Sequence, residues 1–230
     1  MAVPDFEKQW LARLSRRLVE LAGMEIRDEV MKGSEHLSDN SDQREIIYWS
    51  VQALQKLDAL LDDGKKREIL TGCACEYPKS DLQEIREKYA ETGDIDRVHR
   101  MLQEKFRSFL KNRLKIDDGL IRDVVDRGWG LAGVKKGNTI IATKIPKSGN
   151  LVDYMKETDK EKKRALYCHC PRVREAVIMP QVRLSSTYCY CGAGFYKGIW
   201  EEILQRSVSV EVLKTVMKGD DVCQIAIHLD

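Results

Sequence analysis

The hydrophobic pattern of the chain changes at Gly128-Trp129-Gly130, and this change constrains the fold more than any single motif does. Before it, apolar residues recur at spacings of three and four, which is typical of amphipathic helices. After it, short β-branched runs bounded by glycine and proline predict strands. We therefore expect an α+β fold in one compact unit: a helical region at residues 1–130 packed on an α+β cysteine-rich ligand-binding region at residues 131–230, where helices accompany an antiparallel sheet.

Apolar stripes and capping residues predict the individual helices. Asp42 or Ser41 would cap a helix that ends at Gly64, and Asp94 would start a longer one. The stripe of the first helix consists of Phe6, Trp10, Leu14, Leu18 and Leu21. Further helices are expected at residues 117–127, 151–156 and 192–205.

The second half of the chain also predicts strands. A β-branched run at residues 138–146 and two alternating stretches at residues 165–170 and 183–190 have the strand pattern. Residues 159–164 would form a charged surface turn. Residues 208–229 contain two runs in which apolar and polar residues alternate, and Lys218-Gly219-Asp220-Asp221 joins them. This pattern indicates a hairpin.

The charge balance excludes some partners. The 39 Lys and Arg residues against 37 Asp and Glu give a formal net charge of +2, without the basic excess that nucleic-acid binding normally shows. No segment approaches the roughly 18 consecutive apolar residues of a membrane helix. The first ten residues lack the apolar run of a signal peptide. We therefore expect a cytoplasmic protein that binds neither nucleic acid nor a membrane.

Six of the seven cysteines stand in C-x-C pairs, which random scatter would rarely produce. On a strand, residues i and i+2 point to the same face, so two such pairs on adjacent elements would bring four sulfurs together. Four thiolates can hold zinc or an iron–sulfur cluster. The predicted metal ligands are Cys168, Cys170, Cys189 and Cys191, and the alternative ligands are Cys73, Cys75 and Cys223. In the other interpretation, the thiols pack as small apolar residues.

The same cysteines also allow a catalytic interpretation. Cys191 directly precedes a glycine turn and a predicted helix, whose positive end would lower the pKa of its thiol. Cys189 is the second candidate nucleophile, and His169 and His228 are the candidate bases. A surface position on a strand is the alternative explanation for His169.

Basic residues near these pairs indicate an anionic ligand. Lys144 and Lys147 stand in a K-I-P-K-S-G turn, whose backbone amides and ammonium groups could receive a carboxylate or a phosphate. Arg172 and Arg174 complete the predicted ligand-binding set. The strict spacing of a phosphate loop is absent, and a solvated charged face explains these residues about as well.

The closing segment V-E-V-L-K-T-V-M-K-G-D-D-V-C-Q-I-A-I resembles the signature of the 4-vinyl reductase domain and of L-2-amino-thiazoline-4-carboxylic acid hydrolase-like proteins. The matching positions are Glu211, Gly219, Asp220 and Cys223. The blocks Y-C-H-C-P-R-V-R and Y-C-Y-C-G-A-G-F-Y are similar to an uncharacterised bacterial family related to these groups.

This resemblance implies a sheet and helices that enclose a small-molecule pocket, with cysteines that have been proposed to bind metal. Members of these groups act as ligand-sensing modules, as tetrapyrrole-related accessory proteins or as hydrolases. The doubled C-x-C pairs and the helical first half depart from the pattern of these groups, so the resemblance does not identify a ligand or a reaction.

Together these features favour a cytoplasmic small-molecule-binding protein with a C-x-C…C-x-C metal or cluster site. The alternative is a hydrolase of the aminothiazoline-carboxylate type that uses a reactive cysteine or a metal-bound water. A structural or partner-binding protein is the third class. The amphipathic N-terminal helices can dock a second subunit, in a homodimer, as well as they can cap the sheet.

Overall fold

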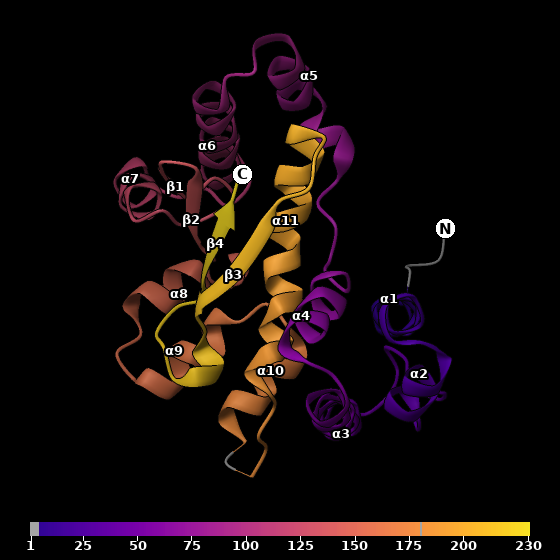
Figure 1. The fold of residues 1–230 in the computed structure, drawn as a ribbon. Coiled ribbons are helices and arrows are strands. Elements are labelled where there is room, and N and C mark those ends of the chain that lie inside the picture. Colours follow the sequence, from indigo (N-terminus) through magenta and orange to yellow (C-terminus); the bar gives the residue numbers. More distant parts are fainter. Residues whose placement is uncertain (1–4, 180) are drawn as a thin grey trace.

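The computed structural model describes residues 5–179 and 181–230 (Figure 1). Within them, eleven α-helices and one four-stranded antiparallel sheet confirm the predicted α+β fold. The helices are α1 (Phe6–Ala22), α2 (Met24–Met31), α3 (Gln43–Leu60), α4 (Asp63–Thr71), α5 (Gln83–Thr92), α6 (Ile95–Asn112), α7 (Asp118–Asp126), α8 (Leu151–Lys156), α9 (Lys160–Tyr167), α10 (Pro171–Ile178) and α11 (Tyr190–Leu204). The strands are β1 (Val134–Lys136), β2 (Thr139–Thr143), β3 (Ser209–Lys214) and β4 (Gln224–His228). Short 3-10 helices are η1 (Lys79–Leu82), η2 (Ser148–Asn150), η3 (Ser186–Cys189) and η4 (Val216–Lys218).

The sheet lies in the second half of the chain, as predicted, with the strand order β1-β2-β4-β3. β2 confirms the strand expected within residues 138–146, and β3 and β4 pair as the predicted C-terminal hairpin. In the centre of the sheet, Ile227 of β4 stands opposite Ile140 of β2 on one side and Val210 of β3 on the other. Ile225 and Ile227 are both buried, so β4 contributes directly to the core.

Helix α11 connects the two halves of the molecule. Figure 1 shows it running alongside β3 and β4, and α4 and α5 pack against it. Ile199, Trp200 and Ile203 are completely buried, which confirms the apolar face predicted for this helix. α4 approaches α11 so closely at Gly194 that a Cβ there would lie 2.0 Å from the carbonyl oxygen of Thr71.

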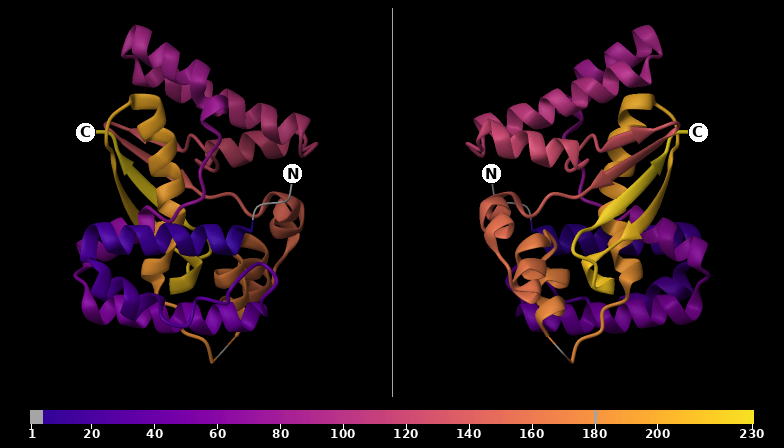
Figure 2. Two further views of the ribbon diagram at one scale, coloured as in Figure 1. Left: turned by 90° about the vertical axis from the view of Figure 1, so that its right-hand side faces the viewer. Right: turned by 90° about the vertical axis from the view of Figure 1, so that its left-hand side faces the viewer.

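The N-terminal helices form a separate group around this centre. In both views of Figure 2, α1–α4 lie together across the lower part of the molecule, and α5–α7 lie above the sheet. The predicted stripe of α1 is confirmed for Trp10, Leu14 and Leu18, which are buried, whereas Phe6 is 38% exposed. Gly23, with a φ of 89°, ends α1 and turns the chain into α2.

Aspartate caps determine where the helices begin. Asp42 and Asp94 cap α3 and α6, and each accepts a hydrogen bond from a backbone N–H in the first turn. The predicted helix end at Gly64 is wrong, because Asp62 caps α4 and Gly64 lies in the first turn of that helix. α7 and α8 confirm the helices expected at residues 117–127 and 151–156.

The two strands predicted around the cysteine pairs are wrong. Residues 165–170 contain the end of α9 and the loop to α10, and residues 183–190 lead through η3 into α11. The turn predicted at residues 159–164 is also wrong, because Asp159 caps α9 there. Pro171 starts α10, where its fixed φ and missing N–H are well tolerated. Short alternating runs do not distinguish a strand from a helix that is buried on several sides.

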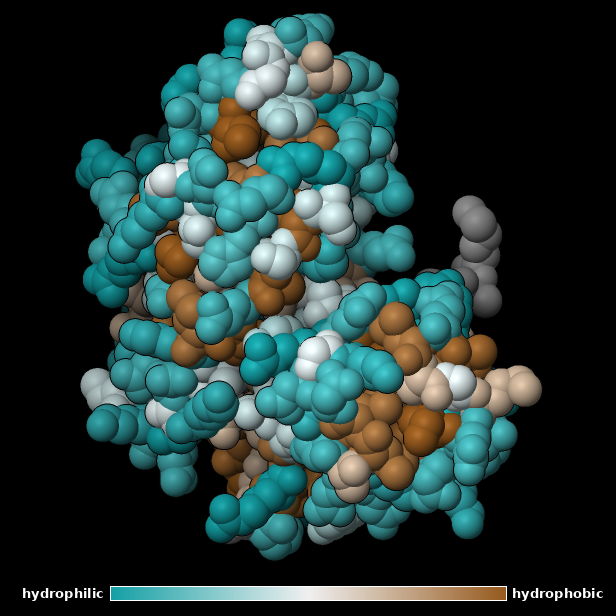
Figure 3. Space-filling model, viewed as in Figure 1, coloured by the Kyte–Doolittle hydropathy of each residue, from teal (hydrophilic) through white to brown (hydrophobic). Residues whose placement is uncertain are grey.

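Hydrophobic surface is unevenly distributed. On the face shown in Figure 3, hydrophobic residues gather at the lower right, over the N-terminal helices. The exposed large apolar side chains of these helices are Phe6, Val19, Met24, Tyr48 and Leu60. The homodimer expected from these helices stays a prediction. None of the helices within residues 5–179 and 181–230 combines the length and the apolar character needed to span a membrane.

Candidate functional site

A cavity of about 950 Å³ lies between the sheet, α1, α6, α11 and the segment that precedes α10. Six of the seven cysteines line it: Cys75, Cys168, Cys170, Cys189, Cys191 and Cys223. Its aromatic wall consists of Phe6, Trp10, Tyr77, Phe106, Phe109, Tyr188, Phe195 and Tyr196. These residues come from both halves of the sequence, so only the folded chain as a whole forms this cavity.

A second depression, of about 960 Å³, lies between α4, α11 and the start of β3. It is more open to solvent, and charged residues of both signs, such as Arg67 and Glu202, line it. Cys75, Tyr77 and Phe195 line both spaces and therefore form the wall between them. Five further thiols line the first cavity and not the second, which makes the first cavity the candidate site.

Lys144 brings a positive charge to the thiols. It follows β2, and its Nζ lies beside the start of α11, 3.5 Å from the position that a Cβ on Gly192 would occupy. Among the residues that the structure describes, no carboxylate or other acceptor bonds this ammonium. Burial lowers the pKa of Lys144, but the ionised forms of Cys168, Cys223 and other neighbours outweigh burial and raise it overall. The side chain of Lys144 is therefore protonated near pH 7 and lies close to the thiols of the cavity.

The thiols of Cys189 and Cys191 do not point to one place. Residues i and i+2 of a helix are about 200° apart around its axis. Cys189 lies at the end of η3, with its Sγ 2.9 Å from Thr215 Oγ1. Cys191 Sγ instead accepts the indole N–H of Trp10 at 3.4 Å and donates to the carbonyl oxygen of Cys73 at 3.5 Å. The same-face geometry predicted for this pair is wrong, because the segment is helical.

The other pair occupies the short connection between α9 and α10. Cys168 follows α9 and is buried. Cys170 is partly exposed and forms the N-cap of α10. The Sγ atom of Cys170 lies 3.2 Å from the Oη atom of Tyr188. Within residues 5–179 and 181–230, no three His, Cys, Asp or Glu side chains are grouped so that they could hold a metal ion. The zinc or iron–sulfur centre stays a prediction from the sequence.

Burial determines the acidity of most of these thiols. It raises the pKa of Cys168 to about 12, although Lys144 opposes the shift. It raises the pKa of Cys191 to about 11, and the hydrogen bond from Trp10 only partly offsets it. Burial raises the pKa of Cys189 as well. The expectation that the start of α11 would lower the pKa of Cys191 is therefore wrong.

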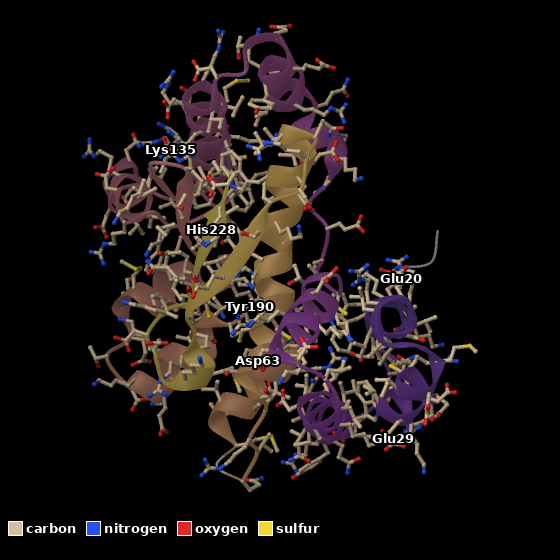
Figure 4. All side chains as sticks on the ribbon, in the orientation of Figure 1. Glu20, Glu29, Asp63, Lys135, Tyr190 and His228 are labelled. Carbon is tan, nitrogen blue, oxygen red and sulfur yellow. The ribbon has the colours of Figure 1, made fainter. Side chains whose placement is uncertain are left out.

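Neither candidate base bonds a thiol. His169 lines the cavity, but its Nε2 lies 2.9 Å from the carbonyl oxygen of Ile145, which requires a proton on that nitrogen. Loss of water around the ring and the charge of Lys144 lower the pKa of His169 to about 4, so the ring is neutral near pH 7. His228 lies on β4 (Figure 4), bonds Thr139 and does not line the cavity.

A buried ion pair behind the cavity wall is the part of the site that the sequence interpretation missed. Arg172, predicted to bind the ligand, is 1% exposed and pairs with Glu7 of α1, which is 5% exposed. Its guanidinium also stacks on the Trp10 ring at 4.2 Å and donates to Ser50 Oγ at 2.8 Å. Burial raises the pKa of Glu7 although Arg172 opposes the shift. Nη1 of Arg172 donates to the Tyr188 hydroxyl at 3.4 Å.

Of the four cations predicted to bind the ligand, Lys144 alone lines the cavity, whereas Lys147, Arg172 and Arg174 do not.

The buried position of Glu7 could be predicted in part from the sequence. It precedes Trp10 by three residues and Leu11 by four, so it belongs to the inner face of α1. A carboxylate on such a face requires a buried partner.

Residues 134–230 match a protein family described as a family of unknown function, DUF6144. The match covers less than half of the chain and includes all four strands, the C-terminal helices and five of the cysteines that line the cavity. Neither the comparison with curated proteins nor the comparison with solved structures found a match.

Proposed function

We propose that the protein is a cytoplasmic small-molecule-binding protein, and that its cavity holds a small anion with the ammonium of Lys144 as its counter-charge. The observation that carries this proposal is an ammonium that faces a thiol-lined cavity without a carboxylate partner in the described part of the chain. Lys144 is only partly exposed, and a charge with little water around it favours an opposite charge nearby, so a ligand that supplies a negative charge completes the site.

The size and the wall of the cavity support this function. A volume of about 950 Å³ falls in the range of roughly 300–1,000 Å³ that is usual for small-molecule sites. Phe195 and Tyr196 lie on the same helix as Gly192, so aromatic surface and the start of α11 face the same ligand. The start of a helix also favours a negative charge. An aromatic or conjugated anion fits such a wall better than a free inorganic ion does.

A matched pair of fluorescent probes tests the proposal. 8-Anilinonaphthalene-1-sulfonate is an anion, and N-phenyl-1-naphthylamine has the same two ring systems without the sulfonate. Removal of the counter-charge in Lys144→Met is expected to weaken binding of the sulfonate by about 1.5 kcal/mol, or about tenfold in Kd. Binding of the neutral probe should change little.

Two further variants serve as controls. Lys144→Arg keeps the charge and should keep the affinity for the sulfonate. Lys147→Met removes an exposed lysine that lies outside the cavity, and it should have no effect. Equal affinity of the wild-type protein and Lys144→Met for the anion would refute the proposal.

A further inference from the structure

The wall of the cavity carries more positive charge than the proposed function uses. Lys105 and Arg113, both from the α6 segment, line the same space as Lys144. Asp81 is the one carboxylate among the described residues that line it, so three permanent cations stand against one anion. A ligand with a single negative charge leaves the positive charge of this wall only partly balanced.

The cation at the end of α6 has no carboxylate partner in the part of the chain that the structure describes. Lys111, two residues earlier, pairs with Asp118 outside the cavity. Arg113 takes part in no ion pair with a described residue, and its guanidinium lines the cavity. A guanidinium presents its donors in a planar fork that matches a carboxylate.

One face of α6 follows the cavity over about two turns. The residues of this face, spaced three to four positions apart, are Lys105, Phe106, Ser108, Phe109, Asn112 and Arg113. Phe106 is 3% exposed and Phe109 is 37% exposed, and Arg113 is exposed as well. The cavity therefore becomes more open towards the C-terminal end of α6, and Arg113 stands near its mouth.

The buried end of the same face lies near Lys144. The ring of Phe106 is so close to Gly130 that a Cβ there would lie 2.2 Å from its Cε1 atom. The backbone N–H of Gly130 donates to the carbonyl oxygen of Thr143 at 2.8 Å, and Thr143 directly precedes Lys144. From Phe106, Arg113 is about 10 Å further along the helix axis, at 1.5 Å per residue.

We propose that the cavity binds an elongated dicarboxylate, with one acidic group at Lys144 and the second at Arg113. The proposal rests on the proposed function, because Lys144 holds the first acidic group. The rings of Phe106 and Phe109, with centroids 6.5 Å apart, line the wall along the helix between the two ends, so an apolar or conjugated body fits there. The side-chain amide of Asn112 provides a further donor beside the second acidic group.

Arg113 also has a role that requires no ligand. It is the C-cap of α6, where a cation stabilises the negative end of the helix dipole. That role concerns the stability of the helix and predicts no preference for one ligand over another. A comparison of two ligands therefore separates it from a binding role.

The experiment uses two ligands that differ in one carboxylate. Trans-stilbene-4,4′-dicarboxylate and trans-stilbene-4-carboxylate share one rigid conjugated body, and each competes with 8-anilinonaphthalene-1-sulfonate for the full chain. The wild-type protein should bind the dicarboxylate about fivefold more tightly, since an exposed ion pair contributes up to about that factor. The two equivalent ends of the dicarboxylate add affinity by themselves, so the decisive quantity is the change of the affinity ratio between wild type and variant.

Arg113→Met should weaken binding of the dicarboxylate about fivefold and leave that of the monocarboxylate nearly unchanged. Arg113→Lys keeps the charge and should keep part of the preference. Lys111→Met is the matched control, because it removes a cation from the same end of α6 outside the cavity, and it should change neither affinity. Lys144→Met should weaken binding of both ligands.

The outcomes separate this inference from the proposed function. If Arg113→Met leaves the affinity ratio unchanged, the second acidic subsite is overturned, even where Lys144→Met weakens both ligands and the proposed function stands. Equal losses for both ligands in Arg113→Met also overturn it, because they show only a general effect of charge. If Lys144→Met weakens neither ligand, the proposed function fails and this inference fails with it.

The wild-type protein alone gives a second readout. Because Arg113 is exposed, salt should screen its contact, and the preference for the dicarboxylate should shrink as the ionic strength rises. Circular dichroism identifies a variant that does not fold, and in that case the salt dependence decides. A preference that is absent or insensitive to salt, or a wild-type protein that binds neither stilbene, overturns the proposal.

Discussion

Gly194 lies where α11 crosses α4, and its replacement by alanine is expected to push the two helices apart. A Cβ at this position would stand 2.0 Å from the Thr71 carbonyl oxygen and 2.8 Å from Ala74 Cβ. Ordinary contacts begin at 3.4 Å, so the gap is about 1.4 Å too short (3.4 − 2.0). The nearest atoms belong to backbone or to a methyl group, so no side-chain rotation can relieve the clash.

The size of the effect follows from two opposing contributions. Alanine is more favourable than glycine in a helix interior by about 1 kcal/mol. Overpacking typically costs about 1–3 kcal/mol, and a fixed backbone atom at this distance places Gly194→Ala at the upper end. The free energy of unfolding should therefore fall by about 2 kcal/mol. For a chain of this size, such a loss lowers Tm by about 4–8 °C.

Gly198 provides the matched control, because it lies one turn further along the same helix with nothing within 4 Å of its Cβ position. Gly198→Ala gains only the helix preference, so its free energy of unfolding should rise by about 1 kcal/mol. Urea and thermal unfolding, followed by far-UV circular dichroism, measure both variants. If Gly194→Ala is as stable as Gly198→Ala, the close crossing of α4 and α11 is refuted.

Three further measurements test other parts of the structure. Burial lowers the pKa of His99 below 6.5, so the unfolded chain takes up the proton first and the free energy of unfolding should fall as the pH drops below about 6.5. Urea titrations at pH 5 and 7 measure this fall, which should be smaller for His99→Gln than for the wild-type protein. Glu7→Ala leaves Arg172 buried without its partner and should lower the free energy of unfolding by about 3–5 kcal/mol; Glu25→Ala, at an exposed position of α2, should change it little. The predicted four-thiol centre requires bound zinc or iron in anaerobically purified protein and a lower Tm in chelator; metal-free protein with an unchanged Tm would contradict it.

The helical half of the fold was readable from the sequence because its signals are local. Asp42 and Asp94 cap the helices that they were expected to cap, and the stripe of α1 from Trp10 to Leu18 is buried. The C-terminal hairpin was readable for the same reason. By contrast, Gly64 does not end a helix, because the side chain of Asp62 accepts a hydrogen bond from the N–H of Lys65 and starts α4 there.

The candidate site was only partly predictable. The sequence identified the cysteine pairs and Lys144, but the direction of each thiol depends on whether its segment is a strand or a helix. Short apolar runs do not determine this, because tertiary burial decides it. The contact between Glu7 and Arg172 joins residues 165 positions apart, and no spacing rule could show it.

The origin of Glu7 in the first helix has a consequence for relatives of this chain. The family match begins at residue 134, so it includes Arg172 and five of the six thiols that line the cavity, but not the carboxylate of Glu7, which neutralises the arginine. A relative that shares only the matched segment must neutralise its equivalent of Arg172 with a residue from elsewhere, or replace that arginine. A property of the cavity should therefore be transferred to a homologue only where that homologue carries an acidic residue facing its equivalent of Arg172.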